Sequence, residues 1–167
     1  MTHHDAGAAA RNKTMEIIMD SIAGIPLFEE VDAESLKVLA AHMHLLETGE
    51  GELVFEEGEK GNYMAFVVDG ELAVIKDAAS GERAVITTLA RGATIGEMAV
   101  IDHFPRSATV IAQTDATLVT LSSEDFQDIL TNFPQVGIAM LKGMARLLSM
   151  HLRKTSSQLA DYMMPLV

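Results

Sequence analysis

Short β-branched segments separated by glycines constrain the fold of this chain more than any other feature. Between positions 45 and 121 six segments are rich in valine, isoleucine, threonine and phenylalanine: 53–55, 65–68, 72–75, 84–87, 108–111 and 116–119. Glycines interrupt them at positions 49, 51, 58, 61, 70, 81 and 92. The pairs Asp69-Gly70 and Ser80-Gly81 are typical of hairpin turns. Many short strands at regular spacing predict an antiparallel sandwich or barrel.

Helical periodicity flanks this region on both sides. The first predicted helix carries Met15, Ile18, Met19 and Ile22 and ends before Gly24 and Pro26. A second is expected to begin at a cap on Asp32 and to carry Leu36, Leu39, Ala40 and Met43. After Leu121, Ser122 and Asp125 resemble a capping box that opens a helix over Phe126–Leu130. Asn132 and Pro134 interrupt it, and one long helix is predicted from Gln135 to about Met163, although Gly137 and Gly143 weaken its first half.

The long helix carries two apolar stripes. The first, sufficient to dock on the barrel, consists of Val136, Met140, Met144 and Leu147. The second has heptad spacing and consists of Leu141, Ala145, Leu148, Leu152, Thr155, Leu159 and Tyr162. We interpret this second stripe, called the seam below, as a homodimer contact; the alternative is that it packs back on Met15, Ile18 and Ile22.

Length and composition indicate one domain with an appended helix. We divide the chain into a flexible N-terminal arm (1–13), a β-roll with N-terminal helices (14–133) and a C-terminal dimerisation or lid helix (134–167). No apolar window approaches the ~20 residues of a membrane span, and no signal peptide is apparent, so a cytoplasmic location is expected. The 167 residues include no cysteine, which excludes disulfides, thiolate metal sites and cysteine nucleophiles.

The negative charge argues against nucleic-acid binding. The net charge is −12, and the region 29–82 holds 14 acidic residues against 3 lysines, a net of −11. Sequence-independent binding to nucleic acid depends on neutralising phosphates, and the one basic stretch (Lys142, Arg146, Arg153 and Lys154) is short. Direct DNA binding is therefore not expected.

The segment from Thr94 to Ala108, called the cassette below, carries the strongest functional pattern. Gly96 permits a ligand to approach the backbone, and a short helix starting at Glu97 would direct the free amides of Met98 and Ala99 at an anion. Arg106 can bind phosphate through two hydrogen bonds, and Ser107 adds a hydroxyl and an amide. An ionised Glu97 accepts the proton of a sugar hydroxyl. The combination suits a compact ligand with one phosphate and one ribose hydroxyl.

Each of these residues also has a structural interpretation. Glu97 could cap the short helix with Thr94, and Gly96 could be an ordinary turn glycine. Arg106 could form an ion pair with Glu97 or Asp102. Taken jointly, with their spacing intact, the residues favour the binding function.

Gly-Glu-Met-Ala-Val-Ile at 96–101, followed four residues later by Arg-Ser-Ala-Thr at 106–109, resembles the phosphate-binding cassette of cyclic-nucleotide-binding domains. Residues 25–28, 67–72 and the long C-terminal helix also resemble that family, so that the resemblance covers about Ile25 to Leu159. It implies an α+β fold in which an antiparallel β-roll (a jelly-roll-like double-stranded β-helix) is flanked by N-terminal helices and a long C-terminal helix.

The resemblance also implies site residues and a ligand. Glu97 would bind the ribose 2′-hydroxyl, and Arg106 and Ser107 would bind the cyclic phosphate. The backbone of Gly96, Met98 and Ala99, with the neighbouring Ile95 and Ala108, would complete that part of the site. Val74, Val85 and Thr87 would line the sugar–base side. Serine at position 107, where members selective for cyclic GMP often carry threonine, favours cyclic AMP, with cyclic GMP as the alternative.

The chain departs from the family in two places. Bacterial activator proteins of this family contact adenine through a Thr-Ser pair on the long helix, and His151 and Leu152 occupy the matching positions here. His151 could bond the base or be structural. Only eight residues follow Leu159, too few for a helix-turn-helix. We therefore expect a non-catalytic, homodimeric sensor without a cofactor, in which the ligand rearranges the long helix and an unknown protein effector receives the signal.

Two other functions remain open. His42 and His44, with Glu47 and Glu50 nearby, faintly resemble the metal-binding pattern of cupin enzymes, although the preceding glycine is missing and a helix is expected to end there. The other alternative is a ligand-free interaction module with the same fold, against which the intact Gly96, Glu97, Arg106 and Ser107 argue.

Overall fold

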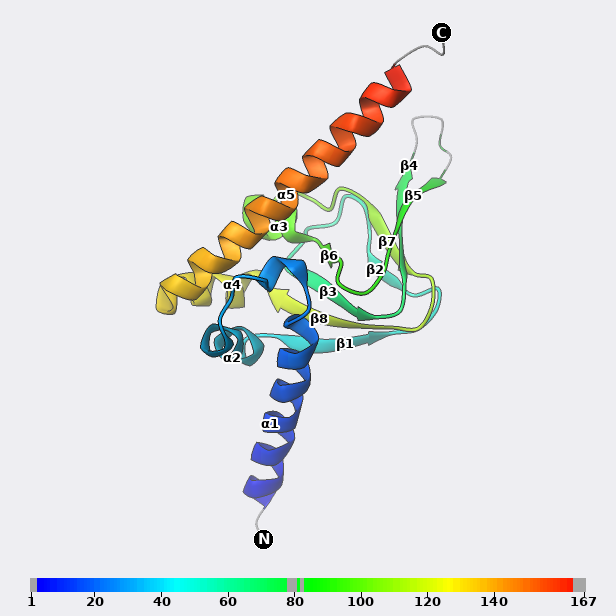
Figure 1. Ribbon diagram of the computed structural model, residues 1–167. Coiled ribbons are helices and arrows are strands. Elements are labelled where there is room, and N and C mark those ends of the chain that lie inside the picture. The colour runs from blue at the N-terminus through cyan, green and yellow to red at the C-terminus, as the bar shows by residue number, and fades with distance from the viewer. Residues whose placement is uncertain (1–2, 78–80, 82, 164–167) are drawn as a thin grey trace.

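The computed structural model describes residues 3–77, 81 and 83–163, and its backbone is an antiparallel β-roll with helices at both ends of the chain (Figure 1). Two four-stranded sheets form the roll. The first has the order β1(His44–Thr48), β8(Ala116–Ser122), β3(Tyr63–Asp69), β6(Thr94–Ile95). The second has the order β2(Leu53–Phe55), β7(Thr109–Ala112), β4(Leu72–Asp77), β5(Arg83–Leu89). The α+β class and the β-roll predicted from the sequence are confirmed.

All six predicted strands form, and the two turn predictions have different outcomes. Strands β4 and β5 pair antiparallel, as the hairpin at Ser80-Gly81 predicts; Ser80 itself lies outside the described residues. The hairpin prediction at Asp69-Gly70 is wrong, because β3 pairs with β6 and β8 whereas β4 pairs with β5 and β7. Gly70 (φ 83°) instead carries the chain from one sheet to the other, and a Cβ there would lie 2.4 Å from the carbonyl oxygen of Asp115.

The N-terminal helices are more extensive than predicted. Helix α1 runs from His3 to Ile22, so most of the segment expected to be a flexible arm is helical. Alanines at positions 8–10 are strong helix formers, which accounts for the extension. The short 3-10 helix η1(Pro26–Phe28) follows, and then α2(Ala33–Ala41), whose predicted cap is confirmed: the Asp32 carboxylate accepts a hydrogen bond from the Ser35 amide at 2.8 Å.

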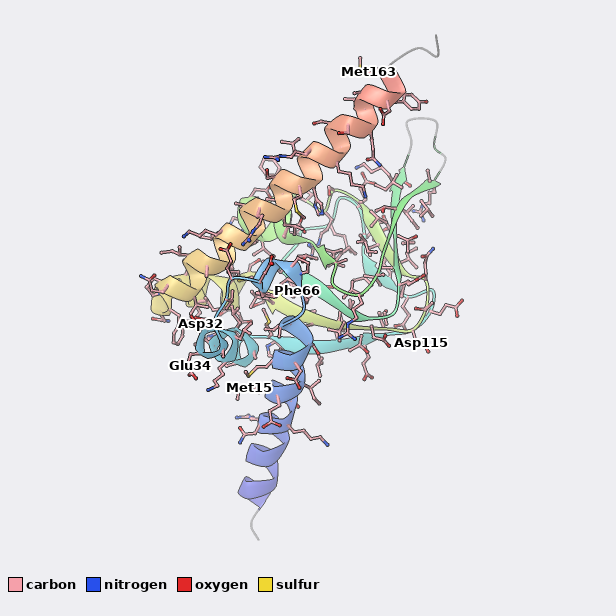
Figure 2. The ribbon with its side chains drawn as sticks, viewed as in Figure 1. Met15, Asp32, Glu34, Phe66, Asp115 and Met163 are labelled. Atoms are coloured by element: carbon pink, nitrogen blue, oxygen red, sulfur yellow. The ribbon has the colours of Figure 1, made fainter. Side chains whose placement is uncertain are left out.

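The helices pack on the outer face of the first sheet. Phe66 of β3 lies at this junction, is fully buried and contacts Phe28 with ring centroids 5.0 Å apart (Figure 2). The core around it contains the buried side chains Ile18, Ile22, Leu27, Leu39, Met64, Leu121, Ile129, Met140 and Met144. A second core inside the roll contains Phe55, Ala65, Val67, Leu72, Ile95, Val110 and Leu118. Among the described residues, no helix is long and apolar enough to cross a membrane.

Helices α3(Glu97–Asp102), α4(Ser123–Asn132) and α5(Pro134–Met163) complete the fold. The cap predicted at the start of α4 is confirmed, since the Ser122 hydroxyl accepts from the Asp125 amide at 2.9 Å. The first stripe of α5 docks as predicted, with Met140 and Met144 fully buried. Gly143 permits this docking: a Cβ there would lie 2.2 Å from the carbonyl oxygen of Leu27.

The second half of α5 extends beyond the roll (Figure 1). Every residue from Ser149 to Met163 is exposed, and Met163 marks the far end of the helix in Figure 2. The seam residues Leu152 and Leu159 are 68% and 57% exposed, so they do not pack on α1. Ile18 and Ile22 instead lie in the core together with the first stripe of α5.

Candidate functional site

The cassette borders a cavity of about 790 Å³ between the second sheet, α3 and α5. Its lining residues come from five parts of the fold: Phe55 of β2; Val74, Ile86, Thr87 and Leu89 of β4 and β5; Thr94 to Ala99 and Asp102 of β6 and α3; Phe104 to Val110, except Thr109; and His151, Lys154, Thr155 and Gln158 of α5. This volume lies in the range of small-ligand sites. The four α5 residues in the lining are exposed.

Gly96 shapes the start of α3. It adopts a left-handed conformation (φ 76°), and no side chain caps the helix, so the alternative in which Thr94 and Glu97 form a capping box is wrong. A Cβ at position 96 would lie 2.4 Å from Nη1 of Arg106 and 2.9 Å from Cζ of Phe55. Glycine is therefore required here by both the backbone conformation and the close approach of Arg106.

Arg106 is buried (6% exposed) without a carboxylate partner among the described residues. Its Nη1 donates to the carbonyl oxygen of Gly96 at 3.3 Å, and its Nη2 donates to that of Tyr63 at 2.7 Å. Burial lowers the pKa of Arg106. The alternative in which Arg106 forms an ion pair with Glu97 or Asp102 is not what the structure shows. A buried cation that lacks an anion is a favourable place for an anionic ligand.

Glu97 is the buried acid of the site (6% exposed). Burial raises the pKa of its carboxyl group, and its own backbone amide and the positive charges of His151 and Arg106 partly oppose that rise. The carboxyl group lines the same cavity as Arg106. The site thus presents one cation and one hydrogen-bond acceptor to a single ligand.

The loop after β2 and the neighbouring strand β4 hold the cassette through hydrogen bonds. The Gly58 amide donates to the carbonyl oxygen of Arg106 at 2.9 Å, and the Arg106 amide donates to that of Glu59 at 2.7 Å. Lys76 of β4 donates to the Glu57 carboxylate at 2.5 Å and to the carbonyl oxygen of Ser107. These contacts hold the backbone on both sides of Arg106.

Four residues of α5 face the cavity, and the sequence analysis identified only His151. Lys154, Thr155 and Gln158 also line it. They follow His151 by three, four and seven residues, a spacing that places them on one helical face and that could have revealed them. Thr155, which the heptad spacing assigns to the predicted seam, is exposed and lines the cavity. Leu152, which occupies the second position of the Thr-Ser pair of the activator proteins, does not line the cavity.

The remaining predicted site residues line the cavity, with one exception. Gly96, Glu97, Met98, Ala99, Arg106, Ser107, Ala108, Val74, Thr87 and Ile95 are all in the lining. The placement of Val85 there is wrong: this side chain is 57% exposed, and Ile86 lines the cavity instead. The register between β4 and β5 shifts between Val74 and Ile75, so the alternation expected of a regular strand does not hold at this point.

The metal-site alternative has no support among the described residues, which include no group of three or more potential ligands. His42 caps the C-terminus of α2 and contacts the Asp128 carboxylate through Nε2 at 3.1 Å. Its Nδ1 lies 2.7 Å from the carbonyl oxygen of Val38. Both ring nitrogens of His42 thus have structural partners.

Comparison with known proteins agrees with this geometry. Residues 45–133 match the family model described as "Cyclic nucleotide-binding domain". A solved cyclic nucleotide-binding domain from Methylobacillus flagellatus KT is 28% identical, with a TM-score of 0.81 over 93% of this chain and 87% of that chain. The N-terminal domain of a transcriptional regulator from Streptomyces coelicolor A3(2) is 29% identical, with a TM-score of 0.70 over 83% of this chain and 94% of that chain.

A curated relative is the cAMP-dependent protein kinase regulatory subunit of Mycosarcoma maydis, which is 36% identical over 111 residues. That match covers 64% of this chain and 21% of the relative. An uncharacterised ABC transporter ATP-binding protein of Mycobacterium tuberculosis is 38% identical over 78 residues, which are 47% of this chain and 24% of that protein. The chain thus spans about a quarter or less of these two relatives. It belongs to the cyclic-nucleotide-binding domain family.

Proposed function

We propose that the chain is a non-catalytic sensor that binds cyclic AMP in the cavity beside α3. The observation that carries this proposal is the placement of Arg106: a buried guanidinium with no carboxylate partner among the described residues lines a cavity of about 790 Å³. A cyclic phosphate would supply the missing negative charge through short, charge-assisted hydrogen bonds.

The neighbouring residues suit the rest of the ligand. Glu97 accepts the ribose 2′-hydroxyl when its carboxyl group is ionised, and Ser107 contacts the phosphate through its hydroxyl and amide. The backbone at Gly96, Met98 and Ala99 surrounds the phosphate. Val74, Thr87, Ile95 and Ala108 line the same cavity, where they would contact the sugar and base.

The base would lie against α5. His151, Lys154, Thr155 and Gln158 present donors and acceptors there in place of the hydroxyl pair of the activator proteins. Ser107 favours cyclic AMP, and cyclic GMP is the competing ligand. The four side chains come from the exposed half of α5, so a bound base would bury part of that half.

We further propose that ligand binding is coupled to homodimerisation along the seam. Thr155 belongs both to the cavity lining and to the heptad seam, so an interaction with the base would change the position of the same helix that contacts a second chain. A ligand shifts such an equilibrium only through its different affinity for the two arrangements. Unchanged hydrogen exchange of residues 133–163 on addition of ligand would contradict this mechanism.

Isothermal titration of the purified protein with cyclic AMP and cyclic GMP tests the ligand. We expect Arg106→Ala and Glu97→Ala to abolish binding while both variants remain folded. Arg146→Ala is the matched control, because Arg146 is an arginine paired with Glu30 at 2.9 Å outside the cavity. No heat with either nucleotide at sub-millimolar concentration would favour the ligand-free module instead. Normal binding by both site variants would show that the contacts are misassigned.

The signal would reach a protein effector. Affinity capture with the full chain, with and without cyclic AMP, tests this step, and an effector would be retained differently in the two conditions. The same partners at the same yield in both would contradict a ligand-dependent output.

A further inference from the structure

Two aromatic rings hold the guanidinium of Arg106 before any ligand arrives. Its Cζ lies 3.5 Å from the ring centroid of Phe55 and 5.1 Å from that of Tyr63. The two rings themselves are 5.1 Å apart at an interplanar angle of 57°. Both distances from Cζ are within the range of about 6 Å in which a cation is attracted to an aromatic face.

The rings are themselves fixed by the fold. Phe55 is 4% exposed in the core of the roll. The Tyr63 hydroxyl donates to the carbonyl oxygen of Val54 at 3.1 Å, which ties this ring to the strand that carries Phe55. Phe55 and Tyr63 both lie against the Arg106 side chain. Their shared feature is the π face that each presents to Arg106.

Hydrogen bonds complete the confinement of Arg106 while leaving donors free. A guanidinium carries five N–H donors, and the hydrogen bonds to the carbonyl oxygens of Gly96 and Tyr63 use two of them. Gly61 and Gly96 allow the chain to approach closely, because a Cβ at either position would lie within 2.9 Å of an Arg106 side-chain atom. The rings neutralise no charge, so the cation stays available to an anion.

We propose that Phe55 and Tyr63 are positioning residues that preorganise Arg106 for a phosphate. This inference deepens the proposed function and rests on it. A long arginine side chain that is mobile before binding must lose that freedom on binding, at a cost of about two- to tenfold in affinity. The two rings remove most of that cost in advance, since they confine the guanidinium beside the cavity and neutralise none of its charge.

Substitutions that remove or retain the rings test the proposal by titration with cyclic AMP. Phe55→Leu keeps an apolar side chain without a π face, and we expect it to weaken binding about three- to tenfold. Tyr63→Leu is expected to act in the same direction, whereas Tyr63→Phe, which keeps the ring, should change affinity less than twofold. Phe126→Leu is the matched control: this phenylalanine is 5% exposed in the other core and should lose stability without losing affinity.

Fluorination of Phe55 distinguishes the electrostatic attraction of the ring face from the packing of the side chain. Replacing Phe55 with 3,5-difluorophenylalanine leaves its shape nearly unchanged and weakens the negative potential of the ring face. We expect the dissociation constant to rise, together with a change in the Arg106 side-chain resonances of the ligand-free protein as the guanidinium moves away from the ring. Equal affinity of the fluorinated, Phe55→Leu and wild-type proteins would overturn the proposal.

The proposed function and this inference fail in different ways. If wild-type protein binds neither cyclic nucleotide, the proposed function fails, and titration of the Arg106 resonances with inorganic phosphate then tests the positioning by itself. Phosphate that shifts these resonances in wild type and more weakly in Phe55→Leu supports the inference. Identical phosphate responses, or none in wild type, overturn it.

Discussion

Gly61→Ala is a sharp test of how the site is built. Gly61 lies in the loop between β2 and β3, and its added Cβ would lie 2.5 Å from Cβ of Ala99 and 2.9 Å from Cζ and Nε of Arg106. Nonbonded carbon atoms prefer separations of about 3.5–4 Å, so α3 and the guanidinium must move by roughly 1 Å and 0.6 Å. The backbone of Gly61 is not in the left-handed region, and the effect is therefore steric.

The magnitude follows from two opposing effects. Overpacking of this kind costs about 1–3 kcal/mol, whereas replacing glycine by alanine returns about 0.4–1 kcal/mol through the unfolded state. We expect a net loss of about 1–2 kcal/mol, which corresponds to a fall in Tm of about 2–8 °C for a chain of this size. Because the clash displaces Arg106 itself, affinity for cyclic AMP should also fall about tenfold or more.

Urea denaturation and calorimetric titration measure the two effects of Gly61→Ala. Gly24→Ala is the control, because a Cβ at Gly24 meets no atom within 4 Å and its φ is also outside the left-handed region. The control should match wild type in affinity. Wild-type stability and affinity in Gly61→Ala would refute the packing of this loop against α3 and Arg106.

Three further predictions concern α5 and Glu97. Gly143→Ala should destabilise the protein by about 1–3 kcal/mol in urea denaturation despite a better helix propensity, because its Cβ would lie 2.2 Å from the carbonyl oxygen of Leu27; unchanged stability would show that α5 does not dock closely on η1. Burial raises the pKa of Glu97, so the folded state retains its proton at higher pH than the unfolded state, and stability falls as pH rises through that interval. Glu97→Gln should therefore be more stable than wild type at neutral pH by about 1 kcal/mol, with the difference lost on acidification; a difference independent of pH would contradict this. Leu159→Glu, at a position 57% exposed, should leave the stability of the isolated fold nearly unchanged and lower the dimer fraction in sedimentation equilibrium; an unchanged fraction would place the dimer contact elsewhere.

The sequence by itself determined the elements that depend on neighbouring residues. The six predicted strands, the caps at Asp32 and Ser122 and the docking stripe of α5 all follow from local pattern, and all appear in the structure. The cassette is also local, since Gly96 to Ala108 form one continuous segment. Short-range periodicity, turn chemistry and motif spacing carry enough information for such features.

Features that depend on distant contacts were decided only by the tertiary structure. Gly70 lies between β3 of one sheet and β4 of the other, and a turn signal does not say whether the flanking strands pair with each other. The register shift in β4 and β5 brings Ile86 to the cavity in place of Val85, because a bulge breaks the alternation that sequence reasoning assumes.

Arg106 shows the same division most clearly. Its place in the cassette is readable from the sequence, whereas its partners Phe55 and Tyr63 lie 51 and 43 positions earlier in the chain. The sequence likewise indicates that Gly143 lowers the stability of the long helix. In the structure this glycine permits a close contact with Leu27, which is far away in the sequence. Local pattern reports the chemistry that a residue can perform, while packing between distant segments sets where that residue is held and what surrounds it.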